Sequence, residues 1–150
     1  MSDMFDFGNG LVPAHKHVNG GGWVAETATA ANSAYIGPDA QVYGTAQVYG
    51  NAWVYGNARV YGDARVYGDA WEFSPFYIQG SRNSLTLCSF TQIAIGCHVH
   101  DIAYCWKKHY KVIGKKEGYS KEQVAEYGEY IELMAKRAKQ YAKAAKAGRA

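Results

Sequence analysis

The chain is poor in the residues that mark several protein classes. It has three prolines, little leucine, and three cysteines (Cys88, Cys97 and Cys105) that cannot all pair with one another, so we expect reduced thiols and a fold that does not depend on disulfides. No apolar run approaches the roughly 20 residues of a membrane-spanning helix. The first residues also lack the basic flank and apolar stretch of a signal peptide. We therefore expect a soluble, cytoplasmic protein with no membrane partner.

Glycine and tyrosine are abundant instead. The chain has 17 Gly and 13 Tyr among 150 residues, and the remaining apolar content is mainly Val and Ala, which favours strands over a helical bundle. Charge is segregated along the chain. Residues 23–72 carry five acids and two arginines, a net charge of −3, residues 99–120 carry five lysines and two acids, a net charge of +3, and residues 136–150 carry six bases and no acid.

A period of six residues organises the first half of the chain. Five clear units begin at Val42, and each starts with VYG: VYGTAQ, VYGNAW, VYGNAR, VYGDAR and VYGDAW. Three weaker units extend the repeat back to Val24. Over all eight units the fifth position is Ala, and the first position is Val or Ile in seven. Such regularity indicates a repeated structural unit.

Each hexad predicts a short strand followed by a corner. In Ala46-Gln47-Val48-Tyr49, small or branched apolar residues alternate with larger ones, which is the period of a strand with Ala and Val on one face. The Gly50-Asn51 pair that follows tolerates the positive φ of a tight corner. Hairpins would leave the strands too short to bury a core. We therefore expect a flat-sided coil in which each strand stacks on the strand one turn later.

These hexads resemble the hexapeptide repeat of left-handed parallel β-helix proteins, in which three hexads make one triangular turn. The resemblance covers residues 24–71. It implies a mainly β fold with three regions: an N-terminal cap over residues 1–22, the β-helix over residues 23–97, and a C-terminal α-helical hairpin over residues 98–150. A looser resemblance to small uncharacterised hexapeptide-repeat proteins of phages and prophages rests on the hexads, SPFYIQGSR and the EGYS segment. It implies the host cytoplasm as the location.

Stacking of every third hexad predicts the outer faces of the coil. One face is aromatic and carries Tyr35, Trp53 and Trp71, with Tyr55 and Phe73 two residues further along. The second face carries Gln41, Tyr43, Arg59 and Tyr61, and the third carries Gln47, Tyr49, Arg65 and Tyr67. An exposed aromatic face of this size marks an interface. Because hexapeptide β-helices are commonly trimers, the resemblance implies a homotrimer.

Two helices are predicted after the repeat. Asp101 is a candidate N-cap for a helix that ends at Ile113, before Gly114. Ser120 and Gln123 form a capping box for a second helix of about 25 residues. Its apolar residues recur every three or four positions, as in an amphipathic helix: Val124, Tyr127, Ile131, Met134, Ala138, Tyr141 and Ala145.

The candidate sites each have an ordinary structural interpretation. His98 and His100 could act as the general base of an acyltransferase, the activity common among relatives of the repeat, although the hexads themselves contain no His. Arg59, Arg65 and Arg82 lie near aromatic residues and could bind an anionic ring-bearing ligand, or they could simply be solvated. Cys97, His100, Cys105 and His109 have the residue types of a zinc site, but they suit a core equally well. We expect no metal and no cofactor, and His15 and His17 are expected at the surface.

We therefore predict a non-catalytic oligomeric binding protein of phage type. It would engage a host protein or sequester a small anionic ligand, and one hypothesis is that it counters host defence. The alternatives are a hexapeptide-repeat acyltransferase that uses a CoA-type donor, and a structural trimerisation module. Nucleic acid is not favoured as a partner, because the basic residues 136–150 lack interleaved aromatic residues and a groove-reading motif.

Overall fold

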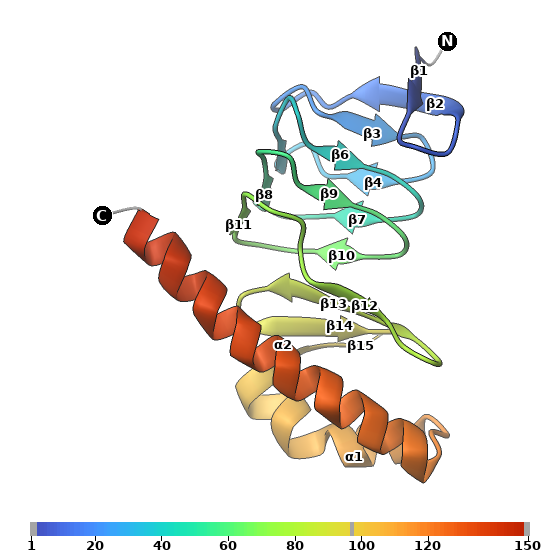
Figure 1. The fold of residues 1–150 in the computed structure, drawn as a ribbon, viewed down its shortest axis with the longest axis vertical. Helices are drawn as coiled ribbons and strands as arrows, with labels where there is room; N and C mark the ends of the chain where they lie inside the picture. Colours follow the sequence, from blue (N-terminus) through green and yellow to red (C-terminus); the bar gives the residue numbers. More distant parts are fainter. Residues whose placement is uncertain (1–2, 97, 149–150) are drawn as a thin grey trace. The chain divides into compact units, whose positions relative to one another are not determined.

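The computed structural model describes residues 3–96 and 98–148, and the chain divides into two compact units at Pro75 and Phe76. Over residues 3–75 the first unit contains these strands (Figure 1): β1 (Asp3–Asp6), β2 (Leu11–Lys16), β3 (Trp23–Ala25), β4 (Thr29–Ala30), β5 (Tyr35–Ile36), β6 (Gln41–Val42), β7 (Gln47–Val48), β8 (Trp53–Val54), β9 (Arg59–Val60), β10 (Arg65–Val66) and β11 (Ala70–Trp71).

The strands of the repeat stack in parallel with the offset that the hexads lead us to expect. Val24 pairs with Val42 and Val42 with Val60, each three hexads further along the chain. The other strands pair in the same way, so the coil has three sheets, with orders β3-β6-β9, β4-β7-β10 and β5-β8-β11. The prediction of a parallel coil is confirmed over residues 23–71.

The inward positions of the hexads form a continuous apolar core. The side chains of the first and fifth positions from Ile36 to Val66 are almost fully buried, and each buried Val stabilises the fold by about 1.5–3 kcal/mol. The corners are formed by glycines with positive φ, such as Gly44 at 67°. A Cβ at Gly44 would lie 2.9 Å from the carbonyl oxygen of Gly62 in the next turn, so this corner requires glycine.

The first turn of the coil is covered by the N-terminal segment. β1 and β2 form an antiparallel hairpin, and β2 pairs antiparallel with β3. Phe5 of this hairpin stacks on Trp23, and Phe7 stacks on Tyr43. His15 is exposed and pairs with Glu26. The expectation of a surface His17 is wrong, because its side chain is 4% exposed and its Nε2 bonds the Ala34 carbonyl.

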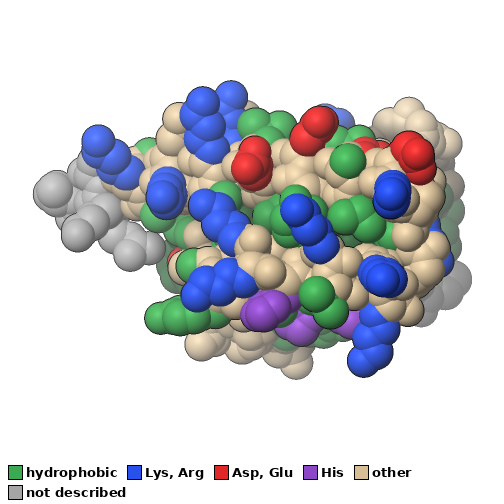
Figure 2. All heavy atoms as spheres, turned by 90° about the horizontal axis from the view of Figure 1, so that it is seen from below, with side chains coloured by type: hydrophobic (Ala, Val, Ile, Leu, Met, Phe, Trp, Pro, Cys, Tyr) green, Lys and Arg blue, Asp and Glu red, His purple; other side chains and the backbone are tan. Residues whose placement is uncertain are grey.

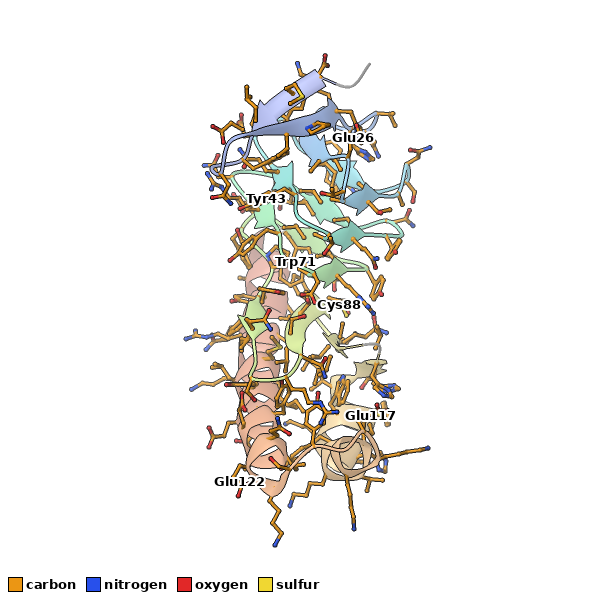
Figure 3. The ribbon with its side chains drawn as sticks, turned by 90° about the vertical axis from the view of Figure 1, so that its right-hand side faces the viewer. Glu26, Tyr43, Trp71, Cys88, Glu117 and Glu122 are labelled. Atoms are coloured by element: carbon orange, nitrogen blue, oxygen red, sulfur yellow. The ribbon has the colours of Figure 1, made fainter. Side chains whose placement is uncertain are left out.

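The last hexad departs from the predicted register. Ala70, not Trp71, pairs with Trp53, and Trp71 pairs with the inward Val54. The Trp71 side chain is 0% exposed and lies inside the coil (Figure 3), where its indole N–H donates to the Gly68 carbonyl at 2.9 Å. The expectation that Trp71 belongs to the outer aromatic face is therefore corrected.

Burial of charge explains this slip. In the regular phase the inward first position of the hexad after Val66 falls on Glu72, and burying an unpaired carboxylate costs far more than burying an indole. The corner is shortened by one residue, and Asp69 takes a positive φ of 67°. A shift of one residue exchanges the two faces of a strand. Trp71 therefore enters the core and Glu72 is exposed.

The second unit contains an antiparallel sheet and a pair of helices (Figure 1). Its sheet has the order β12 (Tyr77–Gln79), β13 (Ser84–Ser89), β14 (Gln92–Ile95) and β15 (His98–Asp101), and every neighbouring pair is antiparallel. The parallel coil therefore ends before the expected residue 97. The regular spacing of Gly corners stops after Gly68, and longer strands joined by short turns replace it.

The helical part follows the predicted caps with different internal boundaries. The Asp101 side chain accepts from the Tyr104 N–H at 3.0 Å, and the first turn, Ile102–Trp106, is π-helical. Helix α1 (Lys107–Lys116) continues past Gly114, and α2 spans Lys121–Gly148. The capping box of Ser120 and Gln123 is confirmed by two hydrogen bonds of 3.0 and 3.1 Å. Within the described ranges, neither helix combines the length and the apolar character that a membrane crossing requires.

The slip at Trp71 predicts unequal effects of two neighbouring substitutions. Trp71→Ala should lower the free energy of unfolding by about 3–5 kcal/mol, because it empties a buried indole site. Glu72→Ala should change it by less than about 0.5 kcal/mol, because the side chain is exposed. Denaturant unfolding of both variants, followed by circular dichroism, measures the two effects. A small loss for Trp71→Ala together with a gain for Glu72→Ala would show the regular phase instead.

Candidate binding pocket

A pocket of about 230 Å³ lies within the second unit, between its sheet and its helices. Aromatic rings from the π-helical turn, α1, the loop after α1 and α2 make most of its wall. Polar groups come from the β12–β13 loop, from β15 and from the residue that follows α1. The aromatic lining residues are Trp106, Tyr110, Tyr119 and Tyr127, and the polar ones are Arg82, Asn83, His98 and Glu117.

Close contact between the helices positions this wall. A Cβ at Gly114 would lie 3.1 Å from Val124, and a Cβ at Gly128 would lie 2.7 Å from the Tyr110 ring. The two glycines therefore let α1 and α2 approach each other. Trp106 is buried and donates its indole N–H to the Ile93 carbonyl at 2.7 Å, which fixes its ring against the sheet.

The Tyr127 hydroxyl holds the β12–β13 loop against α2. It accepts from the backbone N–H groups of Arg82 and Asn83 at 2.9 and 2.5 Å, and it donates to the Asn83 carbonyl at 2.7 Å. The Asn83 amide also donates to the Tyr119 hydroxyl. Burial raises the pKa of the Tyr119 phenol, so this hydroxyl is neutral at physiological pH.

Arg82 contributes positive charge to the pocket. Its Nη1 and Nη2 donate to the carbonyls of Gly118 and Glu117, both at 2.8 Å, and its guanidinium lies 4.7 Å from the centre of the Tyr119 ring. Both acceptors are uncharged carbonyls, and a guanidinium has five N–H donors. Three donors and the full charge therefore remain for a ligand.

His98 joins the pocket to a short chain of polar side chains. Its Nε2 lies 3.0 Å from Glu117 Oε1, and its Nδ1 lies 3.3 Å from His100 Nε2. The carboxylate accepts, so His98 Nε2 carries the proton, and in the neutral ring Nδ1 then accepts from His100. Both nitrogens of His98 are therefore engaged. Figure 2 shows histidine side chains grouped together beside hydrophobic ones, and Figure 3 shows Glu117 near the end of α1.

The environment of His100 favours its neutral form. Burial, and secondly the charge of His98, lower the pKa of His100. Its ring lies edge-on to Trp106, with ring centres 5.1 Å apart. Because the unfolded chain binds more protons than the folded one between the two pKa values, this histidine makes the fold less stable as the pH falls below about 6.5.

The remaining predicted site residues do not converge. Arg59 and Arg65 lie on different sheets of the coil, and Arg82 belongs to the other unit. Cys97 lies outside the described residues. Burial and the charge of Asp101 raise the pKa of the Cys105 thiol, which makes it less reactive, and His109 is exposed on α1. Over residues 3–96 and 98–148, no three His, Cys, Asp or Glu side chains are arranged to hold a metal ion.

Of the predicted aromatic face, Tyr35 and Trp53 lie together. Their rings stack at 4.5 Å, and Trp53 is 51% exposed. Tyr55 lies edge-on to Trp53, whereas Phe73 contacts the buried Trp71. Sequence reasoning missed the roles of Asn83, Tyr119 and Tyr127 in the pocket. Asn83 lies in the β12–β13 loop, where no motif marked it, and the place of Tyr127 in the apolar pattern of the helix indicated packing.

The comparisons with known proteins concern the coil. A family model described as the YdcK beta solenoid repeat matches residues 46–59 and again residues 58–72. The coil therefore carries a β-solenoid repeat. Searches of curated proteins and of solved structures found no match.

The polar chain at His98 predicts how one substitution changes the titration of another residue. His98→Gln should raise the pKa of His100 toward the ordinary histidine value without reaching it, because the charge of His98 is lost while burial, the larger cause, remains. NMR titration of the His100 ring protons measures this pKa. His109→Gln, on the exposed face of α1, is the control and should leave it unchanged. An unchanged pKa in the His98 variant would contradict the observed contact.

Proposed function

We propose that this is a non-catalytic binding protein whose pocket takes a small, ring-bearing anion. The observation that carries the proposal is the pocket itself, which combines an aromatic wall with the Arg82 guanidinium, whose charge no carboxylate contacts within the described residues. A few polar groups in an aromatic concavity are typical of small-molecule sites. Arg also pairs well with planar carboxylates.

The volume restricts the size of the ligand. At about 30 Å³ for each water-sized group, 230 Å³ holds about eight such groups. This is a single ring with one acidic substituent, and it is smaller than the roughly 300–1,000 Å³ of sites for drug-sized ligands. A nucleotide or a CoA thioester would exceed the pocket. An acyltransferase with His98 or His100 as base stays a prediction, and the engagement of both His98 nitrogens does not favour it.

The handedness of the coil and the number of subunits are also part of what we propose. We infer from the resemblance of the hexads that the coil is left-handed and that the protein forms a homotrimer. The exposed Trp53 stacked on Tyr35 supports an interface on that face. The phage origin, the cytoplasmic location, the engagement of a host protein and the trimerisation module stay predictions from the sequence.

Binding of single-ring acids tests the pocket. Benzoate and nicotinate should raise the melting temperature and bind at least tenfold more tightly than benzamide and nicotinamide, which lack the charge that Arg82 would pair. Calorimetric titration measures the affinities. Arg82→Gln should abolish this preference, and Arg59→Gln, in the other unit, should retain it.

A second variant tests the pocket without changing Arg82, in case Arg82→Gln prevents folding. Ile113→Phe adds volume to the pocket wall while Arg82 remains, so it should weaken binding of the same acids at least tenfold. Equal binding of the acids and the amides, or acid binding that survives both Arg82→Gln and Ile113→Phe, would refute the proposal.

Light scattering tests the proposed trimer. The wild type should have three times the mass of one chain, and Trp53→Glu should reduce this to the mass of one chain, because a carboxylate is costly at a desolvated interface. Tyr61→Glu is the control, since this exposed ring lies outside the proposed aromatic face. A wild type with the mass of one chain would contradict the trimer.

A further inference from the structure

A second concave site lies in the first unit, on the coil face formed by β3, β6 and β9. It is a groove of about 410 Å³. Phe5 and Trp23, whose rings stack at 4.8 Å, make its apolar side. The residues used below are these two together with Asp39, Gln41, Asn57 and Arg59, all of which line the groove.

The repeat itself brings the polar side chains together. Trp23, Gln41 and Arg59 are paired in register on the three stacked strands. Asp39 and Asn57 occupy the corner two residues before Gln41 and Arg59, and they hold equivalent positions three hexads apart. Two successive turns therefore present a carboxylate, two amides and a guanidinium to one groove.

One atom of a residue that lines this groove lacks the partner that a buried acceptor normally has. Gln41 Oε1 is the only buried side-chain oxygen or nitrogen of the described residues without a hydrogen bond. An unpaired buried acceptor lowers stability, and native structures keep few of them. The side chains of Asp39, Asn57 and Arg59 also make no hydrogen bond or ion pair within residues 3–96 and 98–148.

We propose that this groove binds a neutral polyhydroxylated ring, such as a pyranose. The carboxylate of Asp39 and the guanidinium of Arg59 offset each other, so the groove has no net preference for a charged ligand. The groove offers both acceptors and donors, and a sugar hydroxyl can donate and accept at once. The C–H face of such a ring suits the aromatic side.

The size of the groove agrees with one sugar unit. At about 30 Å³ for each water-sized group, 410 Å³ holds about 14 groups, and a hexose has about 12 non-hydrogen atoms. The same chemistry is presented by a free monosaccharide and by the terminal unit of a polysaccharide. The proposal is independent of the pocket in the second unit, for which we propose a charged ligand.

NMR of the full chain tests the proposal. Methyl glucoside, methyl galactoside and methyl mannoside should be added up to about 50 mM, since single-sugar sites bind in the millimolar range. At least one should shift the side-chain amide signals of Gln41 and Asn57 and the indole N–H signal of Trp23. Glucuronate and glucosamine should bind no more tightly than the neutral glycosides. No shift at these three groups, or tighter binding of a charged sugar, would overturn the proposal.

The source of the sugar is distinguished in the same experiment. A dextran that binds at least tenfold more tightly per chain end than methyl glucoside indicates a polysaccharide terminus. Equal affinity indicates a free sugar. Both outcomes support the shared chemistry.

Gln41→Leu separates a binding role from a structural one. It removes the unpaired oxygen at nearly constant volume, so the melting temperature should stay the same or rise, while glycoside binding should weaken at least tenfold. Gln47→Leu is the matched control: it occupies the same hexad position one strand later, outside the groove, and should bind as the wild type does. A lower melting temperature for Gln41→Leu would show that the oxygen serves the fold, and unchanged binding would show that it does not serve the ligand; either result would contradict the binding role.

Discussion

The interior of the coil accepts no charge, and the rest of the first unit depends on this constraint. Because the regular hexads place their first and fifth residues inside, the coil can continue only while those positions are small or apolar. Val66 is the last first-position residue to satisfy this in the regular phase. At Glu72 the corner is shortened, Trp71 fills the interior, and the regular hexads stop. The same constraint thus sets the core and the length of the repeat.

A different constraint shapes the second unit. Hydrogen bonds at the edges of Trp106, Tyr119 and Tyr127 fix these rings in the pocket wall, while glycines let the helices approach. The Tyr127 hydroxyl makes three bonds to the β12–β13 loop, and the Trp106 indole N–H is bonded to the sheet. Tyr119 and Tyr127 also contact each other edge-on, with ring centres 5.0 Å apart, so these two rings support each other in the wall. An open volume with aromatic walls remains.

The parts of the fold that were predictable are those in which a short pattern repeats or a local contact determines structure. The stacking of every third hexad follows from the repeat and the resemblance it carries, and the caps at Asp101 and Ser120 follow from residues three apart. The change of register at Trp71 is indicated in the sequence only by Glu72, a single acid at a position that is otherwise apolar. The strands β12–β15 pair with their neighbours in sequence across short connections, but no repeated pattern sets their register.

The candidate sites were harder to predict for a related reason. In the coil the inward residues are nearly uniform, and the outward second position is Tyr in all five clear units. The units differ more at the outward sixth position, which is Gln, Trp or Arg and carries no periodic signal of a site. Gln41 and Gln47 occupy the same hexad position and look alike in sequence. Their surroundings differ, because Phe5 of the β1–β2 hairpin lines the groove together with Gln41, whereas Gln47 does not line it. A repeat therefore acquires a site where an element outside the repeat breaks its symmetry.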